Sequence, residues 1–150
     1  PPPLRWQAMA DEGSHFELLG VHDVRFGEGE RWATARLDGT YRCDAATFGA
    51  DPSPARAKTC EVILLPQAST MARLAWQASA DALVVGYRVY HGARPGSYLQ
   101  PLGSGLGAGL RTTFAVVGLA TGRRHYFAVT AVDSAGSESS YSNEASKKGP

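Results

Sequence analysis

The stretch from Gly118 to Asp133 constrains the fold more than any other part of the sequence. Gly118 and Gly122 bracket a turn, and from His125 onward large and small residues alternate with the period of a β-strand. One predicted face carries His125, Phe127, Val129 and Ala131, and the other carries Tyr126, Ala128, Thr130 and Val132. Because the second face is only moderately polar, we predict that neighbouring strands flank this one on both sides.

The composition excludes several classes of protein. Of the 150 residues, 43% are hydrophobic and 19% are charged, which is typical of a globular chain and not of a disordered one. The net charge of +1 gives no overall field that attracts nucleic acid or an anionic membrane. No apolar run approaches the roughly 20 residues of a membrane-spanning helix. Short apolar runs are separated by 17 Gly and 9 Pro, which predicts an all-β fold.

The two cysteines, Cys43 and Cys60, enclose a loop that contains Gly and Pro. A disulfide here would stabilise the fold by about 3 kcal/mol on the chain-entropy model. Disulfides persist in oxidising compartments, so we expect a secreted or cell-surface protein. The alternative is a pair of buried free thiols. The chain begins at Pro1 without an initiator Met or a signal peptide, as expected of a processed or excised chain.

The strand candidates fall into two units, predicted as residues 1–65 and 66–150, each a small β-sandwich-like module. In the first unit they lie at 4–9, as an edge strand, and at 15–19, 21–26, 31–37, 40–43 and 58–65. In the second unit the strand at 83–90 directs Val85, Tyr87 and Val89 inward. Tyr90, Tyr98 and Tyr126 alternate with inward residues, so we expect them to be exposed. This regular spacing of strands and turns is typical of a β-sandwich.

The second unit resembles a bacterial fibronectin type III domain over residues 66–146. The resemblance rests on Leu74-x-Trp76, Gly86-Tyr-Arg-Val-Tyr90, Gly118-Leu119 and the run from Phe127 to Ser139. Such domains place a corner tyrosine where this chain has His125. The resemblance implies that His125 makes the same hydrogen bond to the backbone.

The first unit carries a second pattern, namely Gly27 to Glu30, Trp32-x-Thr34, Cys43, Phe48-Gly49, Asp51-Pro52 and Lys58-x-Cys60. It resembles a small module that accompanies fibronectin type III domains in secreted bacterial polysaccharide-active proteins. The resemblance implies the Cys43–Cys60 framework and a polysaccharide ligand, but no reaction.

No catalytic or metal-binding constellation is present in the sequence. His15, His22, His91 and His125 lie on separate strand candidates without a metal-ligand spacing, and the serines cluster in turns. The acidic pairs Asp11-Glu12 and Glu28-x-Glu30 sit in turns, where solvated charge is a better interpretation than weak Ca²⁺ binding. The Gly-rich segment 103–109 precedes a strand and not a helix, so it does not predict a phosphate site. We therefore expect a protein without enzymatic activity, metal or other cofactor.

Aromatic and arginine residues of the first unit are the best candidates for ligand binding. Flat rings beside hydrogen-bonding cations suit sugars. The candidate residues are Trp6, Trp32, Tyr41, Phe48, Arg31 and Arg42, and Arg25 and Arg36 accompany them. For Trp32 and Phe48 the alternative is a place in the core of a small unit.

The sequence therefore predicts a non-catalytic binding or display protein outside the cell, with a polysaccharide as its ligand. The alternative is a structural subunit of an extracellular filament or surface assembly. In that case the extended arm from Pro1 to Trp6 would pair with the sheet edge of an extracellular protein partner, including copies of the chain itself. Nucleic acid and membrane insertion are not expected.

Overall fold

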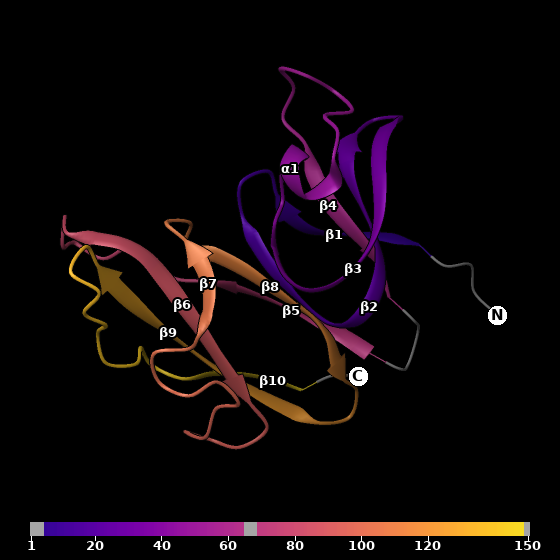
Figure 1. Ribbon diagram of the computed structural model, residues 1–150. Helices are drawn as coiled ribbons and strands as arrows, with labels where there is room; N and C mark the ends of the chain where they lie inside the picture. The colour runs from indigo at the N-terminus through magenta and orange to yellow at the C-terminus, as the bar shows by residue number, and fades with distance from the viewer. Residues whose placement is uncertain (1–4, 65–68, 149–150) are drawn as a thin grey trace.

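The computed structural model of the protein describes residues 5–64 and 69–148 and consists almost entirely of β-strands (Figure 1). The predicted all-β fold of two sandwich-like modules is confirmed. The elements in chain order are β1 (Trp6–Asp11), β2 (His15–Glu28), β3 (Arg31–Arg42), α1 (Ala45–Phe48), β4 (Thr59–Ile63), β5 (Ser69–Ala75), β6 (Val84–Gly92), β7 (Leu106–Gly109), β8 (Thr113–Ala120), β9 (Arg124–Asp133) and β10 (Ala145–Lys148). Within the described residues, no helix has the length and apolar character needed to cross a membrane.

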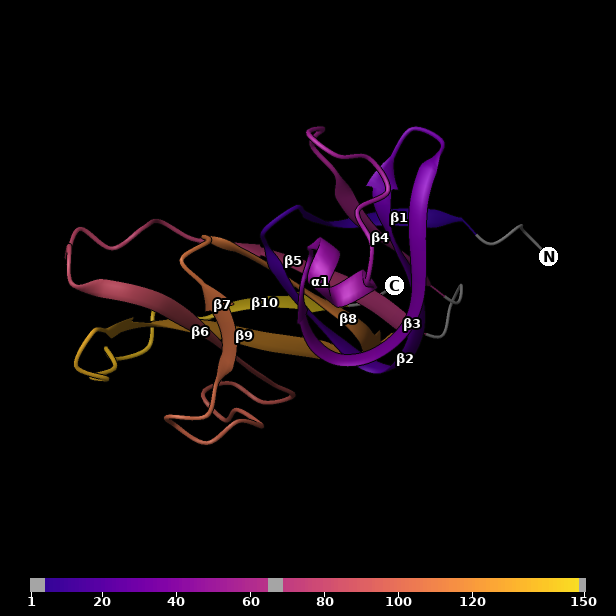
Figure 2. The same ribbon diagram turned by 45° about the horizontal axis from the view of Figure 1, so that its top comes forward.

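The strands form two sheets, which Figure 2 shows from a second direction. The larger sheet has the order β1-β4-β2-β8-β5, with β3 paired to β2, and the smaller has the order β10-β9-β6-β7. As predicted, β9 is flanked on both sides, by β6 and β10. The core of the second unit lies between the β5–β8 part of the larger sheet and the smaller sheet. Its buried members include Ala72, Val89, Val116, Leu119 and Phe127.

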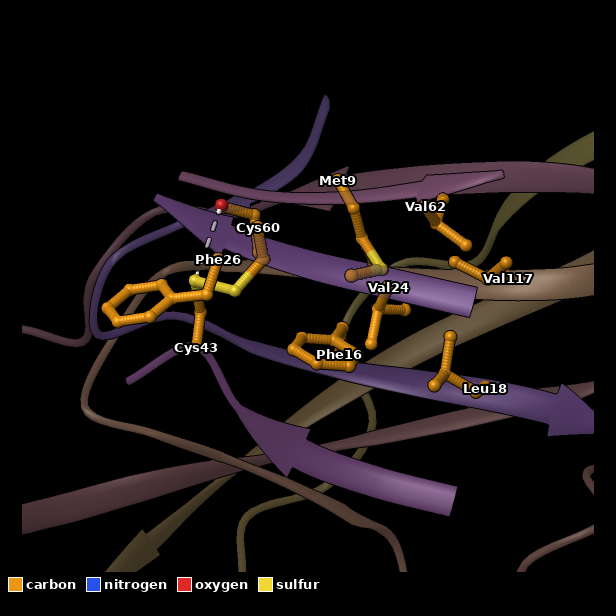
Figure 3. Close-up of a cluster of buried hydrophobic side chains, with 11 residues drawn as sticks. Met9, Phe16, Leu18, Val24, Phe26, Cys43, Cys60, Val62 and Val117 are labelled. Atoms are coloured by element: carbon orange, nitrogen blue, oxygen red, sulfur yellow. Dashed lines mark hydrogen bonds between the residues drawn. A yellow bond between two sulfur atoms is a disulfide. The ribbon is translucent and has the colours of Figure 1, made fainter. Parts of the chain in front are cut away.

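The core of the first unit is built around the disulfide (Figure 3). The predicted bond between Cys43 and Cys60 is confirmed, and it closes the segment that joins β3 to β4. On the chain-entropy model such a bond contributes about 3 kcal/mol. Beside it, Phe48 stacks on the fully buried Phe26 with ring centroids 5.4 Å apart. The bulk of these rings supplies core volume that so small a unit needs.

The long strand β2 belongs to both units. Its first part pairs in parallel with β8, and its later part pairs with β4. The two strand candidates predicted at 15–19 and 21–26 are therefore one continuous strand, bent where its register against β3 shifts. The bend brings Leu19 close to Gly118 of β8. At Gly118 φ is +96°, and a Cβ atom there would lie 2.4 Å from the carbonyl oxygen of Leu19, so the contact requires glycine.

Strand β8 contributes side chains to both cores, and we call it the common wall. Ala115 and Val117 pack into the core of the first unit, whereas Phe114 and Val116 pack into that of the second. The predicted boundary between residues 65 and 66 lies outside the described residues and stays a prediction. The two units are joined through a common sheet as well as through the chain.

Two expectations for β6 are wrong. Tyr90, expected to be exposed, is completely buried because the chain after β9 folds over it and Glu138 accepts a hydrogen bond from its hydroxyl at 2.5 Å. Val85, expected to point inward, is 52% exposed. The register between β6 and β9 shifts between Val84 and Gly86, and such an irregularity turns the residue within it out of the alternating pattern.

His125 makes the backbone hydrogen bond that the fibronectin resemblance implies. Its Nε2 lies 3.0 Å from the carbonyl oxygen of Ala120, so this nitrogen carries the proton and donates. The bond ties the start of β9 to the end of β8.

Candidate functional site

The outer face of the first unit gathers aromatic and polar side chains from four strands. Across β1, β4, β2 and β3, the register aligns Ala8, Glu61, Arg25 and Thr34. Because Val24 and Phe26 are fully buried, the residues that alternate with them on β2 point outward. We call this outward surface the outer face of the first unit.

Arg25 lies at the centre of this face. Its guanidinium carbon is 3.8 Å from the centroid of the Trp32 ring and 4.6 Å from that of Trp6. Glu61 fixes the guanidinium, with Nη2 and Oε1 2.6 Å apart and a second hydrogen bond from Nε at 2.8 Å. Cation–π contacts at partly exposed sites contribute about 0.5–1 kcal/mol each. One guanidinium therefore contacts both indole rings.

A small hollow of about 240 Å³ lies beside Trp6 on the same face. Trp6 and Ile63 form its apolar wall, and Asp23, Thr34 and Arg36 supply polar groups. Asp23 Oδ1 and Arg36 Nε are 3.4 Å apart, and their side chains are 56% and 74% exposed. An exposed pair of this kind keeps free donors and acceptors for a ligand.

The structure brings only part of the predicted set together. Trp6 and Trp32 both contact the guanidinium of Arg25. Tyr41 and Phe48 pack against the core of the first unit, on Phe16 and Phe26 respectively. The other two candidates, Arg31 and Arg42, are exposed on β3 and do not line the hollow.

The sequence reasoning did not single out Asp23, Glu61 or Ile63. The signal for Asp23 is its alternation with the buried Val24 on β2, which places Asp23 on the same face as Arg25. Glu61 and Ile63 join this face only through the pairing of β4 with β1 and β2, which the sequence does not reveal.

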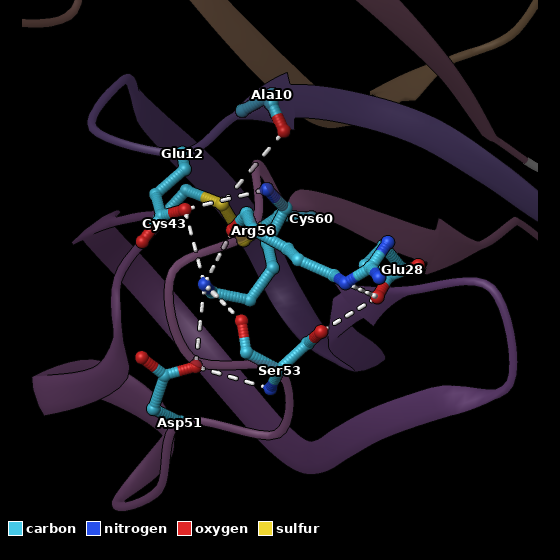
Figure 4. A network of polar contacts seen from close by, with 9 residues as sticks. Ala10, Glu12, Glu28, Cys43, Asp51, Ser53, Arg56 and Cys60 are labelled. Carbon is cyan, nitrogen blue, oxygen red and sulfur yellow. Dashed lines mark hydrogen bonds and ion pairs between the residues drawn. A yellow bond between two sulfur atoms is a disulfide. The ribbon is translucent and has the colours of Figure 1, made fainter.

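A polar network holds the loop between α1 and β4 (Figure 4). Lys58 is buried, and its ammonium donates to the carbonyl oxygens of Ser53 and Arg56 at 2.8 and 2.7 Å. It also lies 3.2 Å from a carboxylate oxygen of Asp51 and 3.5 Å from one of Glu12. The Asp-Pro and Lys-x-Cys signatures therefore meet through the ion pair between Asp51 and the ammonium of Lys58. Among the described residues, no cluster of three or more His, Cys, Asp or Glu side chains is arranged to hold a metal ion.

A tyrosine cluster covers the outer surface of the smaller sheet. Tyr141 makes edge contacts with Tyr90 and Tyr98, with ring centroids 5.2 and 5.1 Å apart. Burial raises the pKa of Glu138, but hydrogen bonds from Thr130, Tyr90 and Arg88 outweigh it and leave the pKa below its ordinary value. This carboxylate is thus ionised and fully engaged, so the cluster serves to hold the segment after β9 in place.

No family model matches the chain. Among solved structures, the chain is similar to a β-1,2-glucanase from Parabacteroides distasonis, with 14% sequence identity and a TM-score of 0.36. The match covers 95% of this chain and 28% of the glucanase. A similarity at this level establishes neither a shared fold nor a shared activity.

Proposed function

We propose that the protein is a non-catalytic carbohydrate-binding protein that holds one residue of a polysaccharide in the hollow beside Trp6. The observation that carries the proposal is the combination of a fixed indole ring with an exposed Asp23–Arg36 pair around about 240 Å³ of space. This volume is below the roughly 300–1,000 Å³ typical of sites for drug-sized ligands. It suits a single sugar ring.

Each wall of the hollow has a role in such binding. The C–H face of a pyranose packs on an aromatic ring, and Trp6, which Arg25 contacts, offers such a ring to the hollow. Neighbouring sugar hydroxyls pair well with a carboxylate and a guanidinium, which Asp23 and Arg36 provide.

The charges around the hollow favour a neutral polysaccharide. Arg25 is paired with Glu61, and Arg36 is paired with Asp23. With each cation already matched by a carboxylate, the site has no net positive charge to attract uronic or sulfated sugars.

The test is binding of the full chain to a panel of neutral and acidic polysaccharides, with variants compared by calorimetry. We expect Trp6→Ala to weaken binding to a neutral member at least about tenfold, a loss of about 1.4 kcal/mol. Trp32→Ala should weaken it less, because Trp32 supports Arg25 but does not line the hollow. Tyr141→Ala, a change to an exposed ring on the other unit, should have no effect. Absence of binding to every member, or equal loss in all three variants, would reject the proposal.

The same proposal places the protein outside the cell, as a secreted or surface-displayed molecule, and the Cys43–Cys60 disulfide supports this. The fibronectin type III assignment of residues 66–146 is part of the proposal. It is supported by the β10-β9-β6-β7 sheet facing the β5–β8 pair and by the bond from His125 to Ala120.

The second candidate function is that of a structural subunit in an extracellular assembly. It is favoured by the sheet edges at β3 and β5, each of which pairs on one side only within residues 5–64 and 69–148. Sedimentation of the protein over a range of concentrations tests it, and a monomer at every concentration would reject it.

A further inference from the structure

The edge strand β5 presents unpaired backbone groups. It pairs with β8, and no other strand within the described residues pairs with it. The N–H of Trp76, just after β5, donates to the carbonyl oxygen of Thr112, just before β8, at 3.0 Å. Backbone groups alternate in direction along an antiparallel strand, so those of Met71, Arg73 and Ala75 face away from β8.

The opposite rim, at β9, is closed in a different way. Val129 and Ala131 each donate their N–H to a serine hydroxyl, of Ser142 and Ser139 respectively, at 2.9 Å. The backbone N–H of each serine donates back to the carbonyl of the same β9 residue. The β9 rim is therefore satisfied by the chain itself, whereas within residues 5–64 and 69–148 no second strand pairs with the β5 rim, and Lys147 bonds only the carbonyl oxygen of Met71 there.

Two adjoining hollows, of about 510 and 550 Å³, lie between these rims. Both are lined by Leu74 and Phe127, which makes them one continuous groove along β5. The floor of the second hollow is apolar, with Trp76, Val129 and Ala131. The indole N–H of Trp76 is buried there and has no hydrogen-bond partner among the described residues.

The charged residues that line the groove are both cations. Arg73 and Lys147 lie in its first hollow, and among the residues that the structure describes no carboxylate lines either hollow. Lys147 reaches across the groove, where its ammonium donates to the carbonyl oxygen of Met71 at 2.7 Å. The ammonium of Lys147 thus bonds a carbonyl oxygen that would accept from the N–H of an added strand.

We propose that the β5 groove binds an extended peptide segment of a partner protein, which adds to the larger sheet as a further strand. The added strand pairs with the outward backbone groups of Met71, Arg73 and Ala75. Its alternate apolar side chains cover Leu74 and Phe127. When the added strand bonds the carbonyl of Met71, the ammonium of Lys147 leaves this carbonyl. An acidic residue at one end of the peptide then pairs with Lys147 and Arg73. Main-chain bonds provide affinity in this mode, and the apolar and acidic positions provide specificity.

The charges argue against the N-terminal arm of a second copy as the occupant. Pro2 and Pro3 have no N–H group to donate to a ladder, and Arg5 would meet the cations Arg73 and Lys147. The groove fits an acidic and apolar segment of a different protein.

The test begins with selection of a phage-displayed decapeptide library on the full chain. We expect the selected sequences to alternate apolar residues and to share an acidic residue at one end. The synthesised peptides should bind at least about tenfold more weakly to Ala75→Pro than to the unmodified protein. A proline is tolerated on an edge strand where its missing N–H faces outward, so the variant should fold. Arg73→Glu should weaken binding as well, and Arg123→Glu, in an exposed turn outside the groove, should not.

A modification of the peptide keeps the test independent of the protein variants. N-methylation at every second peptide residue should abolish binding in one register and leave it unchanged in the other, because only alternate N–H groups face β5. Equal sensitivity at all positions, or peptides without an acidic residue, would overturn the proposal. Self-association of the chain that Ala75→Pro abolishes would overturn it in favour of a second copy. Trp6→Ala should leave peptide binding intact, which separates this site from the proposed carbohydrate site.

Discussion

At the scale of single residues, the buried ammonium of Lys58 is the main polar anchor of the first unit. It is paired with two carboxylates, and it also donates to the backbone carbonyls of Ser53 and Arg56, of which the first accepts a further bond from the backbone N–H of Arg56. Because Asp51 and Glu12 are each 39% exposed, their charges are partly screened. We expect Lys58→Met to lower the free energy of unfolding by about 1–3 kcal/mol, because it removes the donor to the Arg56 carbonyl and the cation that Asp51 and Glu12 share. Urea unfolding measures this. Lys148→Met, at an exposed lysine of β10, is the control, and a similar loss in both variants would contradict the prediction.

His91 gives stability a defined dependence on pH. Burial, and to a lesser degree the neighbouring His125, lower the pKa of His91 from 6.5 to about 4. Between these values the unfolded chain binds a proton that the folded protein does not, so stability is fully present above about pH 6.5 and falls as the pH drops toward 4. The largest contribution of this group is about 3 kcal/mol. Burial also lowers the pKa of His15, which acts in the same direction.

The check is urea unfolding at neutral and mildly acidic pH. His91→Leu should reduce the loss of stability on acidification, leaving the smaller contribution of His15. His22→Leu, at a partly exposed position on β2, should leave the loss unchanged. An unchanged pH dependence in His91→Leu would show that another group controls it.

At the scale of elements, part of β9 bonds to serine hydroxyls in place of the carbonyls of a neighbouring strand. Ser139 and Ser142 take the N–H groups of Ala131 and Val129, and both serines are exposed. Water can therefore compensate for much of a lost hydroxyl. We expect Ser139→Ala with Ser142→Ala to cost only about 1 kcal/mol, but to accelerate hydrogen exchange at the amides of Val129 and Ala131. The nearby Ser140→Ala should leave the exchange of both amides unchanged.

The elements also show which parts of the fold were predictable from sequence. Local patterns located most of the strands and the Cys43–Cys60 bond, but they divided β2 and β3 into two strands each and treated β7 as part of a Gly-rich loop. They did not reveal the parallel β2–β8 pair, because such pairing joins residues about a hundred positions apart and leaves no local signal. For Tyr90, alternation places the ring on the outer face of the smaller sheet and so predicts exposure. The prediction is wrong because the segment that supplies Glu138 folds back and covers the ring.

The candidate site follows the same logic. Residue type alone predicts Trp6 and Trp32 as ligand-binding candidates, because exposed aromatic rings suit sugars, and this stays a prediction. The hollow beside Trp6 depends on the order β1-β4-β2-β3, and this order was not available from the sequence. Tyr41 and Phe48 have the same residue chemistry but face the core, so the face of the strand decides which aromatic residues can meet a ligand.

At the scale of the whole molecule, the shared wall β8 predicts that the two units unfold together. Its residues alternate between the two cores, so loss of either unit exposes apolar surface of the other. Unfolding of the disulfide-intact protein should follow one transition, with the same midpoint by tryptophan fluorescence, by near-ultraviolet circular dichroism and by calorimetry. Two separate midpoints would show that the units are independent.

The junction offers a sharper form of the same prediction. Gly118→Ala places a Cβ atom 2.4 Å from the carbonyl oxygen of Leu19 at a φ of +96°, so β2 and β8 must separate or deform. Gly122→Ala is the matched control, because its φ of +76° carries similar backbone strain with no atom within 4 Å. We expect the control to lose about 1 kcal/mol and Gly118→Ala to lose at least about 2 kcal/mol. If the shared sheet couples the units, Gly118→Ala lowers the single midpoint by all three probes equally. If Gly118→Ala instead splits the transition into two, the cooperative unfolding of the two units depends on the β2–β8 pair. The packing of β8 side chains into both cores then contributes little to that cooperativity.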